Sequence, residues 1–410
     1  MSAPDTGAPD TRVLQDAIDA KARSGGGTVR ISAGRYVTGA LVLRDDITLD
    51  LEAGVVLLAS EDPADYPLIE ARWEGRHQTT HAPLIGGTGL RNIAITGRGT
   101  IDGRGAGWWE RFRAKALDHP RPRLISFAES ANVLVEGLTL VNSPSWTINP
   151  VRCENVTITK VTIRNPPDSP NTDGVNPDSC RYVHISDCHF DVGDDCITIK
   201  SGIETEAAEK RGPCEHITIT NCTMAHGHGG VVIGSEMSGD VRDVAISNCA
   251  FIGTECGIRV KTRRGRGGVV ENVRASNIVM RDVLLPFTVN LFYNAYRKGD
   301  PIVSDKQPRP IDAGTPRVRQ LRFSEITAVD AHYAAAFLYG LPEMPIEAVS
   351  FRDVAIQMSE RATAGKPRNF DDIGTLSRAG FIARNVRGLS LDDVVVSGQQ
   401  GEPFVLTDVW

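Results

Sequence analysis

The sequence predicts an all-β fold, a right-handed parallel β-helix (solenoid) with a short N-terminal capping helix. The main observation is a pattern of alternating apolar residues that restarts every 23 to 34 residues between positions 132 and 272. A repeat of this length without a helical period is typical of a solenoid. The chain also has 40 glycines, 23 prolines and only 6% aromatic residues, which suits many tight turns better than a helical bundle. The right hand follows from the general chirality of parallel crossovers.

The register inside the repeats gives the number of strands in each coil. In the repeats that begin at residues 182, 216, 243 and 272, positions +1, +3, +6, +8, +15 and +17 are apolar. Three short strands per coil, each with one side facing inward, explain this pattern. Position +5 is a turn residue in each coil: Asp187, Asn221, Asn248 and Asn277. Cys188, Cys222 and Cys249 fall in one inward column, so we interpret them as buried apolar thiols rather than disulfide partners or metal ligands.

The N-terminal part of the chain shows a different pattern. Residues 10–22 have apolar side chains at helical spacing after a polar start, and the glycines at 25–27 end this helix. We predict one domain over residues 1–410, with 1–27 as the N-terminal cap region and 28–410 as β-helix coils with loops. Residues 61–86 are less periodic, and we expect a surface loop there.

Charge and hydropathy exclude several classes of protein. The formal charge of −6 argues against a general nucleic-acid binder or a binder of anionic membranes. No apolar run approaches 18 residues, so we expect no membrane span. Residues 1–7 show no basic segment followed by an apolar run. We therefore expect a cytoplasmic protein, or a secreted one if the native N-terminus has been trimmed; the oligomeric state stays open.

Four short polar clusters follow apolar runs in the centre of the chain. They are Asn171-Thr172-Asp173, Gly193-Asp194-Asp195-Cys196, Gly227-His228-Gly229 and Arg259-Val260-Lys261. The coil register places Asp173, the Asp194–Asp195 pair, His228 and then the two cations on one outward sheet face. Each cluster taken alone fits an ordinary turn or a solvated surface. Their joint arrangement favours a catalytic site.

Clustered carboxylates suit the cleavage of a glycosidic bond. One acid must stay protonated to serve the leaving oxygen, and another must be ionised to act on water or on the sugar. Like-charge repulsion raises the pKa of at least one member of such a cluster. His228 can tune or relay the proton, and Arg259 with Lys261 offers paired cations to a substrate carboxylate. We interpret the basic run at 263–267 as a rim for an acidic substrate rather than an RNA-binding tract.

The four clusters, in this order, resemble those of glycoside hydrolase family 28, the polygalacturonases, with Val260 in place of isoleucine. The resemblance implies an inverting hydrolase that cleaves α-1,4-linked galacturonic acid in pectic oligo- or polysaccharides without a metal or cofactor. By position, Asp194 would be the general acid, and Asp173 and Asp195 would activate the water. His228 would support them, while Arg259 and Lys261 would hold the substrate carboxylate. Further candidates for substrate contact are Asn171, Lys200 and either Tyr293 or Tyr296. His77 and His81 are also candidates to line the cleft, although a surface loop position is the default interpretation of both.

The mode of action and the substrate allow alternatives. Residues 234–239 and 145–150 resemble the bacterial branch of the family, which includes exo-acting enzymes, although Asn149 stands where histidine is frequent. We expect an exo-polygalacturonase in which residues 284–316 wall one end of the cleft, with acid and base about 6.5–9.5 Å apart. The alternatives are a hydrolase of another pectic linkage such as rhamnogalacturonan, a calcium-dependent pectate lyase, and a non-catalytic carbohydrate-binding β-helix.

Overall fold

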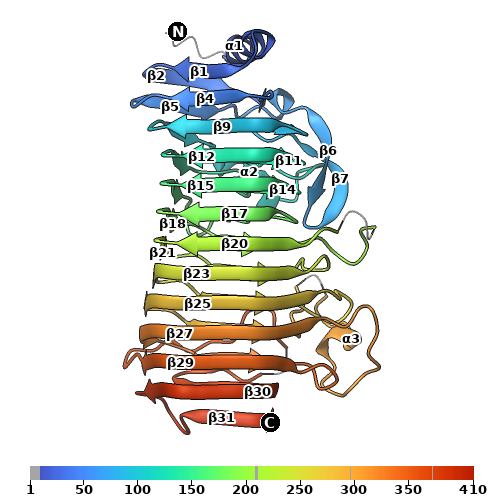
Figure 1. The fold of residues 1–410 in the computed structure, drawn as a ribbon, viewed down its shortest axis with the longest axis vertical. Coiled ribbons are helices and arrows are strands. Elements are labelled where there is room, and N and C mark those ends of the chain that lie inside the picture. Colours follow the sequence, from blue (N-terminus) through green and yellow to red (C-terminus); the bar gives the residue numbers. More distant parts are fainter. Residues whose placement is uncertain (1–9, 208–210, 296, 372) are drawn as a thin grey trace. The chain divides into compact units, whose positions relative to one another are not determined.

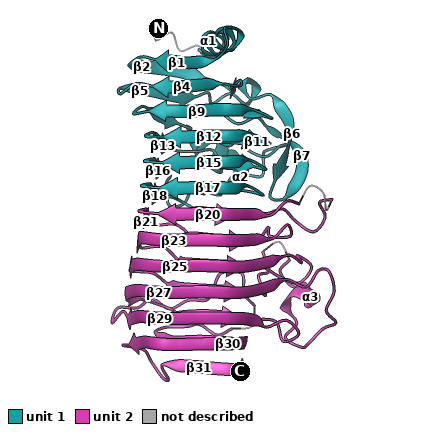
Figure 2. Ribbon diagram, viewed as in Figure 1, with its two compact units in different colours: residues 1–195 teal, residues 196–410 magenta. Residues whose placement is uncertain are grey.

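The computed structural model describes residues 10–207, 211–295, 297–371 and 373–410 (Figure 1). The predictions made for residues 1–7 and for Tyr296 therefore lie outside the described residues. The chain divides into two compact units, residues 1–195 and residues 196–410 (Figure 2). The prediction of a single domain stays a prediction. In the part of the chain that the structure describes, no helix is both long and apolar enough to cross a membrane.

Unit 1 begins with the predicted helix, α1 (Thr11–Arg23), which buries Leu14 and Ile18. A second helix, α2 (Ala106–Arg113), and a short 3₁₀ helix (Pro63–Asp65) were not predicted. The strands are β1 (Gly27–Ile31), β2 (Gly34–Thr38), β3 (Leu41–Val42), β4 (Ile47–Leu51), β5 (Val55–Ala59), β6 (Leu68–Trp73), β7 (Arg76–His81), β8 (Ile85–Thr88), β9 (Arg91–Gly97), β10 (Thr100–Asp102), β11 (Ile125–Ala128), β12 (Ala131–Glu136), β13 (Thr139–Val141), β14 (Ile148–Val151), β15 (Glu154–Thr159), β16 (Thr162–Arg164), β17 (Arg181–Ser186) and β18 (His189–Asp191).

Three parallel ladders run through unit 1, one for each strand of a coil. The first is β1-β4-β9-β12-β15-β17, the second β2-β5-β10-β13-β16-β18 and the third β3-β8-β11-β14. Because side chains alternate along each strand, one set fills the interior and the other faces outward. In β12, for example, Val133 and Val135 are buried while Leu134 is half-buried. This arrangement confirms the predicted parallel β-helix for unit 1.

Unit 2 also consists mainly of parallel strands, several of which are longer than those of unit 1. Its elements are β19 (Ile197–Ile199), β20 (Cys214–Thr220), β21 (Thr223–Ala225), β22 (Val231–Gly234), β23 (Val241–Ile252), β24 (Cys256–Lys261), β25 (Val269–Arg281), β26 (Leu285–Asn290), α3 (Pro301–Ser304), β27 (Arg317–Ala331), β28 (Ala334–Tyr339), β29 (Ile346–Met358), β30 (Ala379–Ser397) and β31 (Phe404–Val409). One parallel ladder is β20-β23-β25-β27-β29-β30, and the other is β19-β22-β24-β26-β28-β30-β31.

The predicted turn column is confirmed by the backbone. Asp187, Asn221, Asn248 and Asn277 have φ angles of 57°, 56°, 55° and 52°, in the left-handed region that asparagine and aspartate tolerate better than most residues. The side chain of Asn277 donates to that of Asn248 on the preceding coil at 2.8 Å. The eight cysteines are all buried, which agrees with the interpretation of Cys188, Cys222 and Cys249 as apolar thiols.

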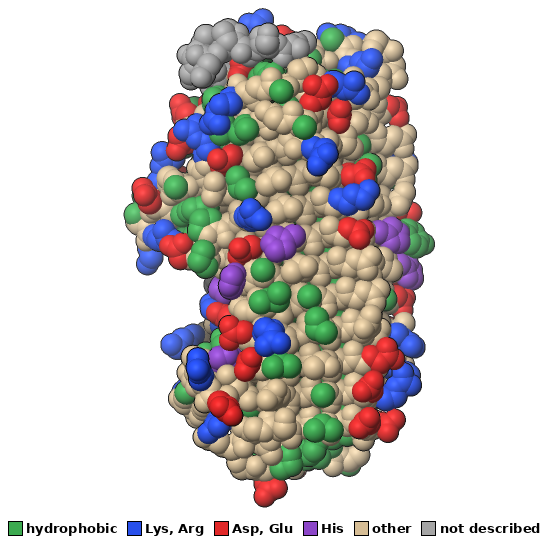
Figure 3. Space-filling model, turned by 90° about the vertical axis from the view of Figure 1, so that its left-hand side faces the viewer, with side chains coloured by type: hydrophobic (Ala, Val, Ile, Leu, Met, Phe, Trp, Pro, Cys, Tyr) green, Lys and Arg blue, Asp and Glu red, His purple; other side chains and the backbone are tan. Residues whose placement is uncertain are grey.

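The expectation of an irregular loop at residues 61–86 was wrong. Strands β6 and β7 form an antiparallel hairpin in this segment, and β8 begins the next coil at Ile85. The segment 284–316 was predicted to wall one end of the cleft. Its first part is strand β26, and the wall itself stays a prediction. On the face shown in Figure 3, acidic and basic side chains are interspersed and the apolar ones are scattered in small groups. That face therefore carries no extended field of one sign.

Candidate active site

Three carboxylates meet at the C-terminal end of unit 1. Asp173, Asp194 and Asp195 each place one carboxylate oxygen within 4.8 Å of the other two. Asp173 and Asp195 are buried, with 4% and 1% exposed, whereas Asp194 is half-buried. The backbone explains the alignment, because Gly174 N–H donates to the carbonyl of Asp195 at 3.0 Å and sets the two segments side by side. Asp194 is thus the member of the cluster with most access from outside.

The separation of acid and base in an inverting pair is measured between carboxyl groups, and about 6.5–9.5 Å is expected. The value of 4.8 Å is a limit on the distances between one oxygen of each of the three acids. The expected separation therefore stays a prediction. The same three oxygens resemble the donor set of a hard cation. The charge of Arg121 interacts with those of Asp173 and Asp194. This guanidinium therefore repels a metal cation that would bind to the three oxygens.

Arg121 anchors the segment that carries Asp173, and sequence reasoning missed it. Its guanidinium donates to the carbonyls of Pro144 (2.9 Å) and Pro170 (2.7 Å) and to Oδ1 of Asn171 (2.7 Å). It also lies 3.9 Å above the ring of Phe112. Burial lowers the pKa of Arg121 to about 10, against the opposing effect of Glu74, Asp173 and Asp194, so the group stays charged at neutral pH. Local sequence gives no signal for this role, because all these partners are distant in sequence except Phe112.

Asn171 and Asp173 are therefore held by neighbours within unit 1. The side chain of Asn171 accepts from Arg121, and its φ of 54° puts the turn in the left-handed region. Asn176 Nδ2 donates to Oδ2 of Asp173 at 3.0 Å, and the Asp173 carbonyl accepts from Thr147 N–H at 2.9 Å. The predicted contact of Asn171 with substrate stays a prediction.

In unit 2, Arg259 and Lys261 lie on β24 and face one aromatic ring. They are 2% and 8% exposed, and their charged groups lie 5.4 Å and 5.5 Å from the ring centroid of Tyr293. The hydroxyl of Tyr293 accepts from Nδ2 of Asn369 at 2.9 Å. These contacts bring Tyr293 together with both predicted cations. Of the two tyrosines proposed, it is the one that the structure describes.

His228 has an acidic neighbour that the sequence did not suggest. Its Nε2 lies 3.9 Å from Oε1 of Glu255, and Glu255 is bound through both oxygens by Arg368. The carbonyl of Arg368 in turn accepts from Arg259 at 3.4 Å. A loop more than 100 residues further along the chain thus connects predicted site residues of unit 2.

Lys200 and Glu236 form a buried ion pair in unit 2, with Nζ and Oε2 2.7 Å apart. Burial alone would raise the pKa of Glu236, but the charges of Lys200, Arg266 and Lys261 together lower it to about 2. Glu236 is therefore ionised at neutral pH. The ammonium group of Lys200 binds Glu236 in this pair, and the substrate contact predicted for Lys200 stays a prediction.

The basic run at 263–267 is not a solvated rim. Arg263, Arg264 and Arg266 are between 4% and 7% exposed. Glu204 pairs with Arg263 and Arg266, and Glu343 pairs with Arg264. This part of the sequence interpretation was wrong, because the acids that neutralise the run lie outside it.

The predicted cleft histidines both belong to strand β7 in unit 1. His81 bonds through Nδ1 to the carbonyl of Pro120 at 2.9 Å, and burial lowers its pKa. His77 lies opposite Arg72 on β6 and lines a cavity described below. The four clusters were predicted to share one outward face. Because they belong to both units, this stays a prediction.

Comparison with known proteins gives the family. Residues 39–370 match the family model "Glycosyl hydrolases family 28". A "Probable polygalacturonase" of Vitis vinifera is 34% identical, covering 86% of this chain and 72% of the relative. An "Endo-polygalacturonase" of Pectobacterium carotovorum subsp. carotovorum is 30% identical over 65% of this chain and 69% of the relative.

Solved structures agree in fold. The exopolygalacturonase of Thermotoga maritima has a TM-score of 0.80 and 27% identity, covering 96% of this chain and 89% of that one. The family 28 exopolygalacturonase of Yersinia enterocolitica has a TM-score of 0.79 at 23% identity, covering 99% and 76%, which speaks for the fold alone. With its carboxylate cluster and the family match over most of its length, the chain belongs to family 28 of the glycosyl hydrolases and is a glycosidase.

Proposed function

We propose that the chain is a polygalacturonase that cleaves α-1,4-galacturonosidic bonds in pectic oligo- or polysaccharides. The observation that carries the proposal is the cluster of Asp173, Asp194 and Asp195 in a chain of this family. Relatives that cover most of the chain are named polygalacturonases, which supports this substrate. A galacturonate substrate is anionic, and the two cations on β24 suit its carboxylate.

The roles of the acids follow from their exposure and contacts. Asp194 is the most accessible carboxyl and takes the role of general acid toward the leaving oxygen. Asp173 and Asp195 together hold and deprotonate the attacking water, so the product inverts at the anomeric carbon. His228 supports the ionised acids, while Arg259, Lys261 and Tyr293 bind the substrate.

Proton NMR of the first product tests inversion: an α-linked substrate must yield the β-anomer, and an initial α-anomer would refute the mechanism.

An exo mode of action is the finer part of the proposal. One support is the likeness to the Thermotoga exopolygalacturonase. A second is hairpin β6–β7, because its turn residue Glu74 lies near enough to Arg121 for the two charges to interact, and Arg121 also interacts with Asp173 and Asp194. In this proposal the hairpin closes one end of the space for substrate. Product analysis on polygalacturonate decides: monomer alone from the outset supports exo action, and mixed oligomers from the outset refute it.

The decisive variant is Asp194→Asn. We expect the turnover of digalacturonate to fall by about 10²- to 10⁴-fold, because a general acid contributes about that much. The matched control is Asp187→Asn, at a turn position where three other coils already have asparagine. Unchanged turnover in Asp194→Asn would refute the assignment. Calcium-dependent formation of an unsaturated sugar would instead identify a lyase.

A further inference from the structure

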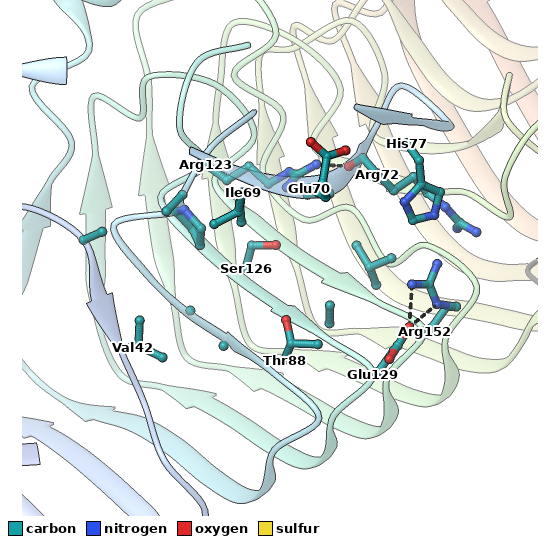
Figure 4. A pocket seen from close by; sticks show the side chains of 18 of the residues that line it. Val42, Ile69, Glu70, Arg72, His77, Thr88, Arg123, Ser126, Glu129 and Arg152 are labelled. Atoms are coloured by element: carbon teal, nitrogen blue, oxygen red, sulfur yellow. Dashed lines mark hydrogen bonds and ion pairs between the residues drawn. The ribbon is translucent and has the colours of Figure 1, made fainter. Parts of the chain in front are cut away.

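Unit 1 contains a cavity that none of the predicted catalytic residues lines. It measures about 580 Å³ and lies between hairpin β6–β7 and the outer face of the ladder β3-β8-β11-β14 (Figure 4). Cavities of about 300–1,000 Å³ hold small ligands. The hairpin is anchored beyond the cavity, because Arg72 binds Asp178 at 2.6 Å and Trp73 stacks on Trp146 at 4.7 Å. The cavity is thus a lasting feature of the fold rather than a gap under a loose loop.

The floor of the cavity consists of small and apolar groups. Gly86 of β8 and Ser126 and Ala128 of β11 line the ladder side, which is this floor. Val42 of β3 and Ile69 of hairpin strand β6 also line the cavity. Gly86 cannot be replaced without cost, because a Cβ there would lie 2.4 Å from the Ser126 carbonyl and 2.5 Å from Pro83. The floor therefore offers small, largely apolar groups to a ligand.

Three arginine side chains around the cavity already interact with other groups of the protein. Arg152 donates to Glu129 at 2.6 Å, and Arg72 is paired with Asp178. Arg123 is 3% exposed, lies against the rings of Trp73 and Trp146, and donates to the carbonyl of Arg72. A carboxylate ligand that pairs with Arg72 or Arg123 would have to break these buried contacts, which costs several kcal/mol per displaced charge. The Arg152–Glu129 pair is more exposed, with side chains 22% and 54% exposed, and the carboxylate of Glu129 repels an anion there. An uncharged ligand fits without that cost.

Oxygen acceptors complete the lining. The hydroxyl of Ser126 already donates to the Asn149 carbonyl at 2.8 Å, so its lone pairs remain to accept from a ligand. The carboxylates of Glu70 and Glu129 lie at the rim, where they accept from Thr79 and Arg152 and have further lone pairs. A ligand with several hydroxyl donors and one apolar face matches this lining. In a glycosidase, we propose that the cavity is an accessory site for a neutral sugar residue, separate from the acid cluster.

Binding of methyl glycosides of galactose, xylose, rhamnose and arabinose tests the proposal, by ligand-observed NMR on the full chain, with galacturonic acid for comparison. The obstructing variant is Ala128→Phe, and the matched control is Ala94→Phe, another half-buried strand alanine of unit 1. We expect at least one neutral glycoside to bind the wild type and Ala94→Phe, and to bind Ala128→Phe at least tenfold more weakly. Val42→Trp, at a 43% exposed position on the cavity edge, serves as second variant if Ala128→Phe does not fold.

Three outcomes overturn the proposal. The first is that no neutral glycoside binds the wild type, and the second is that the obstructed variants bind as tightly as the wild type. The third is that galacturonic acid competes for the same site with equal affinity, since the paired charges are expected to exclude an anion. The test does not depend on the proposed reaction, because it measures binding and not turnover.

Discussion

The Lys200–Glu236 pair allows a quantitative prediction. Its charged atoms are 2.7 Å apart, and the side chains are 8% and 7% exposed. Removing one partner of a buried pair leaves the other charge uncompensated and costs about 3–5 kcal/mol. Glu236→Gln keeps the shape and an accepting oxygen, so we expect the lower end, about 3 kcal/mol, in the free energy of unfolding at pH 7. The control is Glu347→Gln, whose partner Arg387 is exposed, with an expected cost below about 1 kcal/mol.

The dependence on pH gives a second, independent measure. The pKa of Glu236 is about 2, below the ordinary 4.5. The folded state thus binds the proton less readily than the unfolded state, and the stabilisation is fully present above pH 4.5 and lost as the pH falls through 2. At about 1.4 kcal/mol per unit, the difference corresponds to about 3 kcal/mol. The unfolding free energies of wild type and Glu236→Gln should therefore differ at pH 7 and converge toward pH 2.

Urea denaturation followed by circular dichroism between pH 7 and pH 3 provides the assay. A Lys200→Met/Glu236→Gln double variant completes the cycle, and we expect a coupling energy above about 1 kcal/mol because the two groups are in contact. The double variant should recover only part of the stability that the single variants lose, since Arg266 and Lys261 also interact with Glu236. A loss below 1 kcal/mol at pH 7, or a loss that does not change with pH, would refute the reasoning.

Two further predictions concern residues that position the site. Arg121→Ala removes three hydrogen bonds and leaves buried carbonyls without donors, so we expect a loss of several kcal/mol in stability and a lower kcat; stability within about 1 kcal/mol of wild type in urea titrations would contradict this. Tyr293→Phe keeps the ring that faces Arg259 and Lys261, whereas Tyr293→Ala removes it. We expect the KM for digalacturonate to rise by less than about threefold in the first and about tenfold in the second; equal effects would show that the ring itself contributes nothing.

The sequence was sufficient where the signal is local and repeated. The turn column at Asp187, Asn221, Asn248 and Asn277 was read from residue type alone, and each position has the expected positive φ. The inward positions could also be predicted, because alternate residues of a short strand lie on the same side, and one side faces the core. The three aspartates could be predicted because the loop that carries Asp173 and the turn that carries Asp194 and Asp195 occupy equivalent positions in successive repeats.

Hairpin β6–β7 was missed because long-range contacts stabilise it. Its strands alternate poorly, with Glu70 and Arg72 in β6 and a run of polar residues in β7. Arg72 is nevertheless 3% exposed, since Asp178, 106 residues further along the chain, neutralises it. No local pattern reveals such a partner. The same holds for Arg121, whose contacts extend to Pro170 and Asn171.

Lys200 shows why an outward position is not the same as an exposed one. It follows β19 and was placed on the outer side of its coil by the register. The segment after β22 covers that side, because Ser201 N–H donates to the Glu236 carbonyl at 2.8 Å and Gly239 N–H donates to the Ser201 carbonyl at 2.7 Å. This covering removes water from Lys200, and a buried ammonium then requires an acid, which Glu236 supplies. The register can therefore predict that a lysine points outward from its coil. Whether its ammonium group can contact a substrate depends on the segment that covers it and on the acids that this segment supplies.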